Sequence, residues 1–145
     1  MLRFAVRALV PILCLGLALG ATGCGKKDAD SPAAPAAGVT VTGLELGRSV
    51  GGDKRVSEKV DDFSPNDMIY ASVLTSGTSS NATLKARWTF EDGQLVDESE
   101  QRIAPTGDAA TEFHISKPDG WPVGKYKVEV FLNGSSARSM DFEVK

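Results

Sequence analysis

The chain has 145 residues, of which 41% are hydrophobic and 24% are charged, with two cysteines and a single histidine. This length accommodates one ordinary domain with some residues to spare and excludes two full-sized domains. With 16 basic against 19 acidic side chains, the net charge of −3 argues against a protein that binds nucleic acid by neutralising phosphates.

The first 23 residues are organised like a secretory signal peptide. Arg3 and Arg7 form a short positive segment, and residues 8–19 follow as about a dozen uncharged, mostly apolar residues. Small residues then lead directly to Cys24. This ending resembles the lipobox of bacterial lipoproteins, in which the cysteine receives a diacylglycerol thioether and becomes the mature N-terminus. The resemblance implies a signal peptide over residues 1–23 and lipidation of Cys24.

Two other interpretations of this segment stay open: an uncleaved transmembrane helix, and a cleaved signal that leaves Cys24 unmodified. Glycines and Pro11 dilute the apolarity of residues 8–25, whereas a bilayer span requires about 20 predominantly apolar residues. The cysteine count agrees with lipidation, since Cys14 leaves with the signal and Cys24 carries the lipid. The mature chain then has no free thiol and no disulfide, so packing alone must hold an exported domain together.

Residues 24–38 are predicted to be the lipidated cysteine and a flexible linker. Ten of the fourteen residues from Gly25 to Gly38 are Gly, Ala, Ser or Pro, which offer no apolar surface for folding. The mature chain has 14 basic and 19 acidic side chains, so we expect membrane attachment through the acyl chains on Cys24 rather than a basic patch. In proteobacterial lipoproteins an Asp after the cysteine marks inner-membrane retention, and by this resemblance Gly25 implies the outer membrane.

Residues 39–145 alternate between apolar and polar side chains with the two-residue period of β-strands. In the clearest case, one face of a strand consists of Leu84, Ala86, Trp88 and Phe90. We predict about seven short strands, near residues 39–46, 69–74, 83–91, 95–102, 111–116, 125–132 and 140–144.

The predicted strands are separated by recognisable turns and one irregularity. Asp92-Gly93 and Asn133-Gly134 are dipeptides typical of hairpins in which both central residues have positive φ. The alternation changes parity across Thr42-Gly43, which indicates a β-bulge in the first strand. Residues 48–65 contain two adjacent glycines and mixed charges, and we expect them to form a mobile connection.

No segment is long enough to serve as a helix between parallel neighbours, so the strands are expected to form an antiparallel sandwich of two sheets. Trp88 and the residues from Gly124 to Val128 resemble those of an immunoglobulin-like or fibronectin-type domain, with Tyr126 in the tyrosine-corner position. By this resemblance, Val73 and Val128 stand where antibody domains have their disulfide cysteines. It implies a cysteine-free immunoglobulin-like β-sandwich over residues 39–145 in which Trp88 packs on aliphatic side chains.

The sequence shows no set of residues suited to catalysis, and we expect no catalytic residue, cofactor or metal site. His114, the single histidine, lies on the polar face of its predicted strand, where it is solvated. One histidine without a free thiol provides no zinc set, no serine–histidine–aspartate arrangement and no cysteine nucleophile. Carboxylate pairs such as Asp97-Glu98 lie at turns or exposed edges, and the nearest approach to a calcium loop lacks the required glycine.

Two aromatic residues are candidate partner-binding residues. Trp121 lies between two prolines in the loop 117–124 and could stack on a sugar ring or a hydrophobic partner. The alternative, which we favour, is that Trp121 caps one end of the sandwich and excludes water from the core. Phe131 should lie on the outer face of a sheet, where clustering with Tyr70 or Leu74 would indicate an interface.

These features together predict a non-enzymatic envelope lipoprotein, tethered by lipid to the periplasmic face of the outer membrane, that binds a protein or glycan partner. The alternative is a structural accessory subunit that docks permanently into a larger envelope complex through a sheet edge or an outer face. Nucleic acid is not an expected partner.

Overall fold

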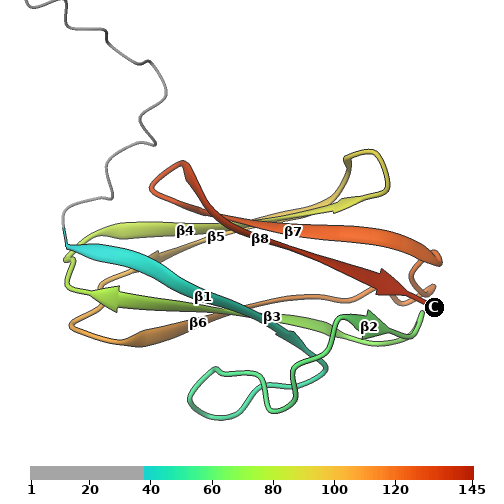
Figure 1. Cartoon of the computed structure of the whole chain (residues 1–145), viewed down its shortest axis with the longest axis horizontal. Coiled ribbons are helices and arrows are strands. Elements are labelled where there is room, and N and C mark those ends of the chain that lie inside the picture. Colours follow the sequence, from blue (N-terminus) through green and yellow to red (C-terminus); the bar gives the residue numbers. More distant parts are fainter. Residues whose placement is uncertain (1–37) are drawn as a thin grey trace, which may run out of the picture. The chain divides into compact units, whose positions relative to one another are not determined.

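The computed structural model describes residues 38–145, which form two β-sheets packed face to face (Figure 1). The predicted signal peptide, Cys24 and residues 25–37 of the predicted linker lie outside the described residues. No helix that could span a bilayer occurs among residues 38–145. In chain order the strands are β1 (Val39–Gly47), β2 (Asp62–Phe63), β3 (Ile69–Gly77), β4 (Ala82–Phe90), β5 (Gln94–Ile103), β6 (Ala109–Ile115), β7 (Gly124–Leu132) and β8 (Ser135–Val144).

Three strands form one sheet in the order β1-β3-β6, and five form the other in the order β2-β8-β7-β4-β5. Every pairing is antiparallel except the short parallel ladder between β2 and β8. The seven predicted strands are confirmed as β1 and β3 to β8, and the fold is the expected immunoglobulin-like β-sandwich. The sequence does not predict β2, because two residues are too few for an alternating pattern.

The core lies between the two sheets and follows the alternation of the sequence. Ala86, Trp88 and Val128 are completely buried, and so is Val73 on the opposite sheet. The indole ring of Trp88 meets the ring of Phe142 edge-on, with 5.9 Å between the ring centroids. The expectation that Trp88 packs on aliphatic side chains is therefore incomplete, because β8 brings an aromatic ring against it.

The two hairpin turns differ from each other. Between β7 and β8, Asn133 and Gly134 both have positive φ, as the Asn-Gly dipeptide predicts. Between β4 and β5 the hairpin is present, but the residues with positive φ are Glu91 and Gly93. The prediction that Asp92 shares this conformation is wrong, because the loop has three residues instead of two. The register of β1 against β3 shifts at residues 41–43, which confirms the predicted bulge.

Tyr126 forms the tyrosine corner that the sequence predicts. Its hydroxyl donates a hydrogen bond of 2.7 Å to the carbonyl of Pro122, four residues upstream. Burial, and secondarily the negative charge of Glu91, raises the pKa of the Tyr126 hydroxyl. The corner ties the loop before β7 to the body of the sandwich.

Substituting Tyr126→Phe should lower the free energy of unfolding by about 1–2 kcal/mol, because the hydrogen bond from the buried Tyr126 side chain to the Pro122 carbonyl is lost. Urea denaturation followed by circular dichroism measures this change. Tyr70→Phe is the matched control, since Tyr70 is half-buried and its hydroxyl makes no hydrogen bond within the described residues. Equal effects of the two substitutions would contradict the role of the corner.

The connection 48–65, which the sequence predicts to be mobile, makes backbone and side-chain contacts in the structure. Val50 and Val56 form a backbone bridge, so part of the connection folds back on itself. Its Lys54 carbonyl accepts a hydrogen bond of 2.8 Å from the hydroxyl of Ser72, which is completely buried although it points away from the core. The connection therefore covers part of the outer face of the three-stranded sheet, through polar contacts that leave no apolar pattern in the sequence.

Candidate functional site

The loops of the sandwich gather at its two ends (Figure 1). The described chain enters at one end, where Val39 at the start of β1 pairs with Gly77 at the end of β3. The opposite end carries the loops 64–68, 91–93 and 116–123, and we call it the far end. Two surface hollows and the exposed large apolar side chains of the described residues lie there, which makes the far end the candidate functional site.

The first hollow, the aromatic groove, has a volume of about 710 Å³ and lies between the start of β5 and the end of β6. These are edge strands of opposite sheets, so the groove runs along an open side of the sandwich. Its lining includes Phe90, Leu95, His114, Pro118, Trp121 and Tyr126. The tilted rings of Phe90 and Tyr126, with centroids 4.7 Å apart, form part of this lining.

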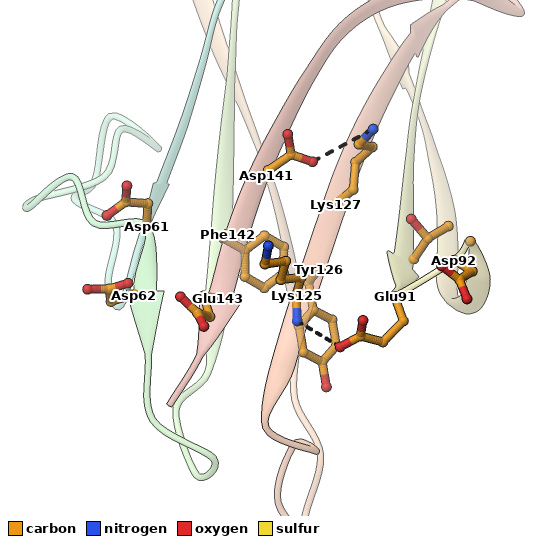
Figure 2. Close-up of a pocket in the computed structure, with 12 residues that line it drawn as sticks. Asp61, Asp62, Glu91, Asp92, Lys125, Tyr126, Lys127, Asp141, Phe142 and Glu143 are labelled. Carbon is orange, nitrogen blue, oxygen red and sulfur yellow. Dashed lines mark hydrogen bonds and ion pairs between the residues drawn. The ribbon is translucent and has the colours of Figure 1, made fainter.

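The second hollow, the acidic hollow, has a volume of about 670 Å³ and lies on the other side of the β4–β5 turn. Its charged lining consists of Asp61, Asp62, Glu91, Asp92, Asp141, Glu143, Lys125 and Lys127, most of which Figure 2 shows around β7 and β8. Lys145 adds a third ammonium group, which lies 2.8 Å from Asp62 and 3.7 Å from Glu143. Six carboxylates against three ammonium groups leave the hollow with a net negative charge. Tyr126 lines both hollows, so the two are adjacent.

The carboxylates of the acidic hollow differ in their contacts. Glu91 accepts a hydrogen bond of 3.1 Å from the backbone N–H of Lys125, as Figure 2 shows, and Asp141 lies 3.7 Å from the ammonium group of Lys127. Asp61 and Asp92 have no side-chain hydrogen bond or ion pair within residues 38–145. Negative charge is therefore left uncompensated on both sides of β7 and β8.

Trp121 is only 6% exposed and forms part of the packed far end. Its indole N–H donates a hydrogen bond of 2.9 Å to the carbonyl of Asp67, and its ring meets that of Tyr126 edge-on. The Asp67 carboxylate accepts hydrogen bonds from the Ser64 N–H and the Arg48 guanidinium, which lower its pKa. This placement favours the interpretation of Trp121 as a cap, and its role in partner binding stays a prediction.

Three large apolar side chains are exposed among the described residues, and all three lie in or beside the loops of the far end. Met68, Leu95 and Val123 are 40%, 55% and 66% exposed respectively. The amino-acid pattern does not distinguish these three residues from other apolar residues. Their signal is weak, since Leu95 and Val123 belong to short apolar stretches, Leu95-Val96 and Trp121-Pro122-Val123, which do not show which side chain is exposed.

Phe131 lies on the outer face of the five-stranded sheet, as predicted, and is half-buried there. The ammonium group of Lys85 sits 4.9 Å from the centre of its ring, which covers part of it. Tyr70 and Leu74 lie on the outer face of the three-stranded sheet instead. The structure therefore does not bring Phe131 together with them, and a binding role for Phe131 stays a prediction.

His114 lies at the rim of the aromatic groove and is largely exposed. Its Nδ1 atom is 2.5 Å from a carboxylate oxygen of Glu112, and its ring centroid is 5.4 Å from that of Tyr70. No group of three or more His, Cys, Asp or Glu side chains in the described part of the chain is arranged to hold a metal ion.

No protein-family model and no curated protein sequence matches the chain. Solved structures with a similar fold include an immunoglobulin-like protein from Pseudomonas aeruginosa, at 16% identity over 74% of this chain and 96% of that one, with a TM-score of 0.47. A CARDB domain from Pyrococcus furiosus, in complex with di-metal ions, is 13% identical over 74% of this chain and 87% of that one, with a TM-score of 0.43.

The alkylpurine DNA glycosylase AlkC from Pseudomonas fluorescens is 15% identical over 74% of this chain, with a TM-score of 0.48. This chain covers only 30% of the length of that enzyme. At these identities and TM-scores the likenesses carry no information on ligands or activity. The strand order and register by themselves define the fold.

Proposed function

We propose that the protein is a lipid-anchored, non-catalytic module of the bacterial cell envelope that binds a protein or glycan partner through the far end of its β-sandwich. The observation that carries this proposal is the segregation of features between the two ends. The chain enters the domain at Val39, whereas both hollows and the exposed Met68, Leu95 and Val123 lie at the opposite end.

This arrangement suits a module that is tethered at one end and makes contact with the other. The nine residues of β1 span roughly 30 Å at about 3.3 Å per residue. The fourteen predicted linker residues extend at most about 45 Å. The far end can therefore meet partners well beyond the lipid headgroups while Cys24 stays in the membrane.

Site-specific photocrosslinking tests the proposed contact surface. A benzophenone side chain at position 123 should capture a partner in intact cells, whereas the same probe at Ser80, in an exposed loop at the opposite end, should not. Equal capture from both positions, or capture from position 80 alone, would overturn the proposal. A captured protein that stays bound in a fixed ratio after detergent extraction would instead identify a structural accessory subunit.

The anchor is tested through Cys24. The wild-type protein should be labelled by radioactive palmitate and stay in the membrane pellet after carbonate washing, because two or three acyl chains hold a protein durably at a bilayer. Cys24→Ser should abolish the label and release the protein from the pellet. An unlabelled wild-type protein whose mature N-terminal cysteine has no lipid mass would refute lipid anchoring.

A further inference from the structure

We infer that the far end accepts an extended peptide segment of a partner protein that carries Lys or Arg residues beside aliphatic ones. This inference rests on the proposed function, in that it takes the far end as the contact surface. The aromatic groove provides the apolar half of the site through Leu95, the large exposed apolar side chain of its lining, and the acidic hollow provides the electrostatic half.

The apolar half has a rigid wall, and its lining includes one exposed aliphatic side chain, that of Leu95. Trp121 and Tyr126 are 6% and 3% exposed, and both are fixed by hydrogen bonds to backbone carbonyls. Leu95 lines the groove and is 55% exposed. Val123, which is 66% exposed, is the last residue of the loop 116–123, and other residues of this loop form one wall of the groove. The groove has the size of a pocket that holds a few side chains, and a preformed wall lowers the entropic cost of binding.

The negative charge of the acidic hollow determines which side chains of a peptide segment are favoured beside these apolar residues. The acidic hollow adjoins the groove at Tyr126, and its six carboxylates exceed the three lysines beside them, which are Lys125, Lys127 and Lys145. Asp61 and Asp92, without ion pairs in the described residues, are available to a cation. The hollow therefore attracts Lys or Arg and repels anionic lipids, nucleic acid and acidic peptides.

Two other possible ligands of the far end, a glycan and a second copy of this chain, agree less well with these observations. A sugar ring stacks on a bare aromatic face, but the rings of Trp121 and Tyr126 are almost completely covered. A second copy of this chain, docked far end to far end, brings carboxylates against carboxylates. A basic peptide with aliphatic residues matches both halves of the site.

The experiment uses the full lipidated protein in nanodiscs of phosphatidylcholine, with empty nanodiscs as the blank. The probes are three fluorescent nine-residue peptides that alternate Lys with Leu, Lys with Ser, and Glu with Leu. In fluorescence anisotropy the Lys/Leu peptide should bind at least tenfold more tightly than the other two, because only it matches both halves. Equal binding of the Glu/Leu peptide, or no binding of the Lys/Leu peptide, would overturn the inference.

Double variants show which part of the surface binds the Lys/Leu peptide. D61N/D92N should weaken binding of the Lys/Leu peptide about threefold to tenfold, whereas E58Q/E100Q removes the same charge elsewhere on the surface and should leave it unchanged. L95S/V123S should weaken binding about tenfold or more without lowering the melting temperature, since both side chains are exposed.

Three outcomes overturn the inference. Equal effects of the two charge pairs would show unspecific attraction, and displacement of the Lys/Leu peptide by a neutral chitooligosaccharide would point to a glycan site. If the crosslinker at position 123 captures a partner while the Lys/Leu peptide does not bind, the inference fails and the proposed function stands.

Discussion

Substituting Trp121→Ala should lower the free energy of unfolding by about 3–4 kcal/mol. The side chain is 94% buried and packs edge-on against Tyr126, and its removal leaves a cavity and an unpaired Asp67 carbonyl. For a domain of this size the change corresponds to a fall in melting temperature on the order of 10–20 °C. Thermal and urea denaturation, followed by circular dichroism, measure both quantities.

The substitution Trp121→Phe distinguishes the contribution of ring packing at position 121 from that of the indole hydrogen bond. It keeps most of the packing against Tyr126 but removes the indole N–H that donates to Asp67, so we expect a loss of about 1–2 kcal/mol. If Trp121→Ala left the melting temperature unchanged but abolished capture of a partner, Trp121 would be a recognition residue and not a cap of the core.

Substituting Trp88→Ala should destabilise the domain by about 3–5 kcal/mol, because a completely buried indole is removed from the centre of the sandwich. Trp88→Phe should cost much less, on the order of 1 kcal/mol. The Nε1 atom of Trp88 has no hydrogen-bond partner within the described residues, and phenylalanine removes this unsatisfied donor while it keeps an aromatic ring beside Phe142.

The two phenylalanine substitutions form a matched pair. At position 121 phenylalanine removes a satisfied N–H, whereas at position 88 it removes an unsatisfied one. Trp121→Phe should therefore be at least as costly as Trp88→Phe, although Trp88 is the more deeply buried of the two. A loss above about 2 kcal/mol for Trp88→Phe, with a smaller loss for Trp121→Phe, would contradict this assignment.

The sequence predicts the buried side chains best where a strand has one buried face and one exposed face. Leu84, Ala86 and Trp88 alternate with polar residues, and the structure buries all three completely. The tyrosine corner was predictable for a similar reason, since Tyr126 occupies a fixed place in a strand whose alternation defines its inward face. In both cases the signal lies in neighbouring residues and requires no knowledge of distant contacts.

The candidate site was predictable only in part. Trp121 stood out because two prolines flank it, but the sequence left its orientation open, and the Asp67 carbonyl that fixes its indole is 54 residues away. Leu95 and Val123 gave no periodic pattern, since each belongs to a stretch of only two or three apolar residues beside a turn. Their common location follows from the antiparallel order of the strands, which brings the loops 91–93 and 116–123 to the same end.

The sequence by itself determined the strand content and the inward faces of the β-sandwich, because the two-residue period of side chains is a local property of the chain. Only the tertiary structure shows that the connection 48–65 covers Ser72 and that the indole N–H of Trp121 is hydrogen-bonded to the Asp67 carbonyl. It also decided that carboxylates from β2, β8 and the β4–β5 turn surround one hollow. Each of these features joins segments far apart in the chain, through polar contacts or shared surface that no local pattern encodes.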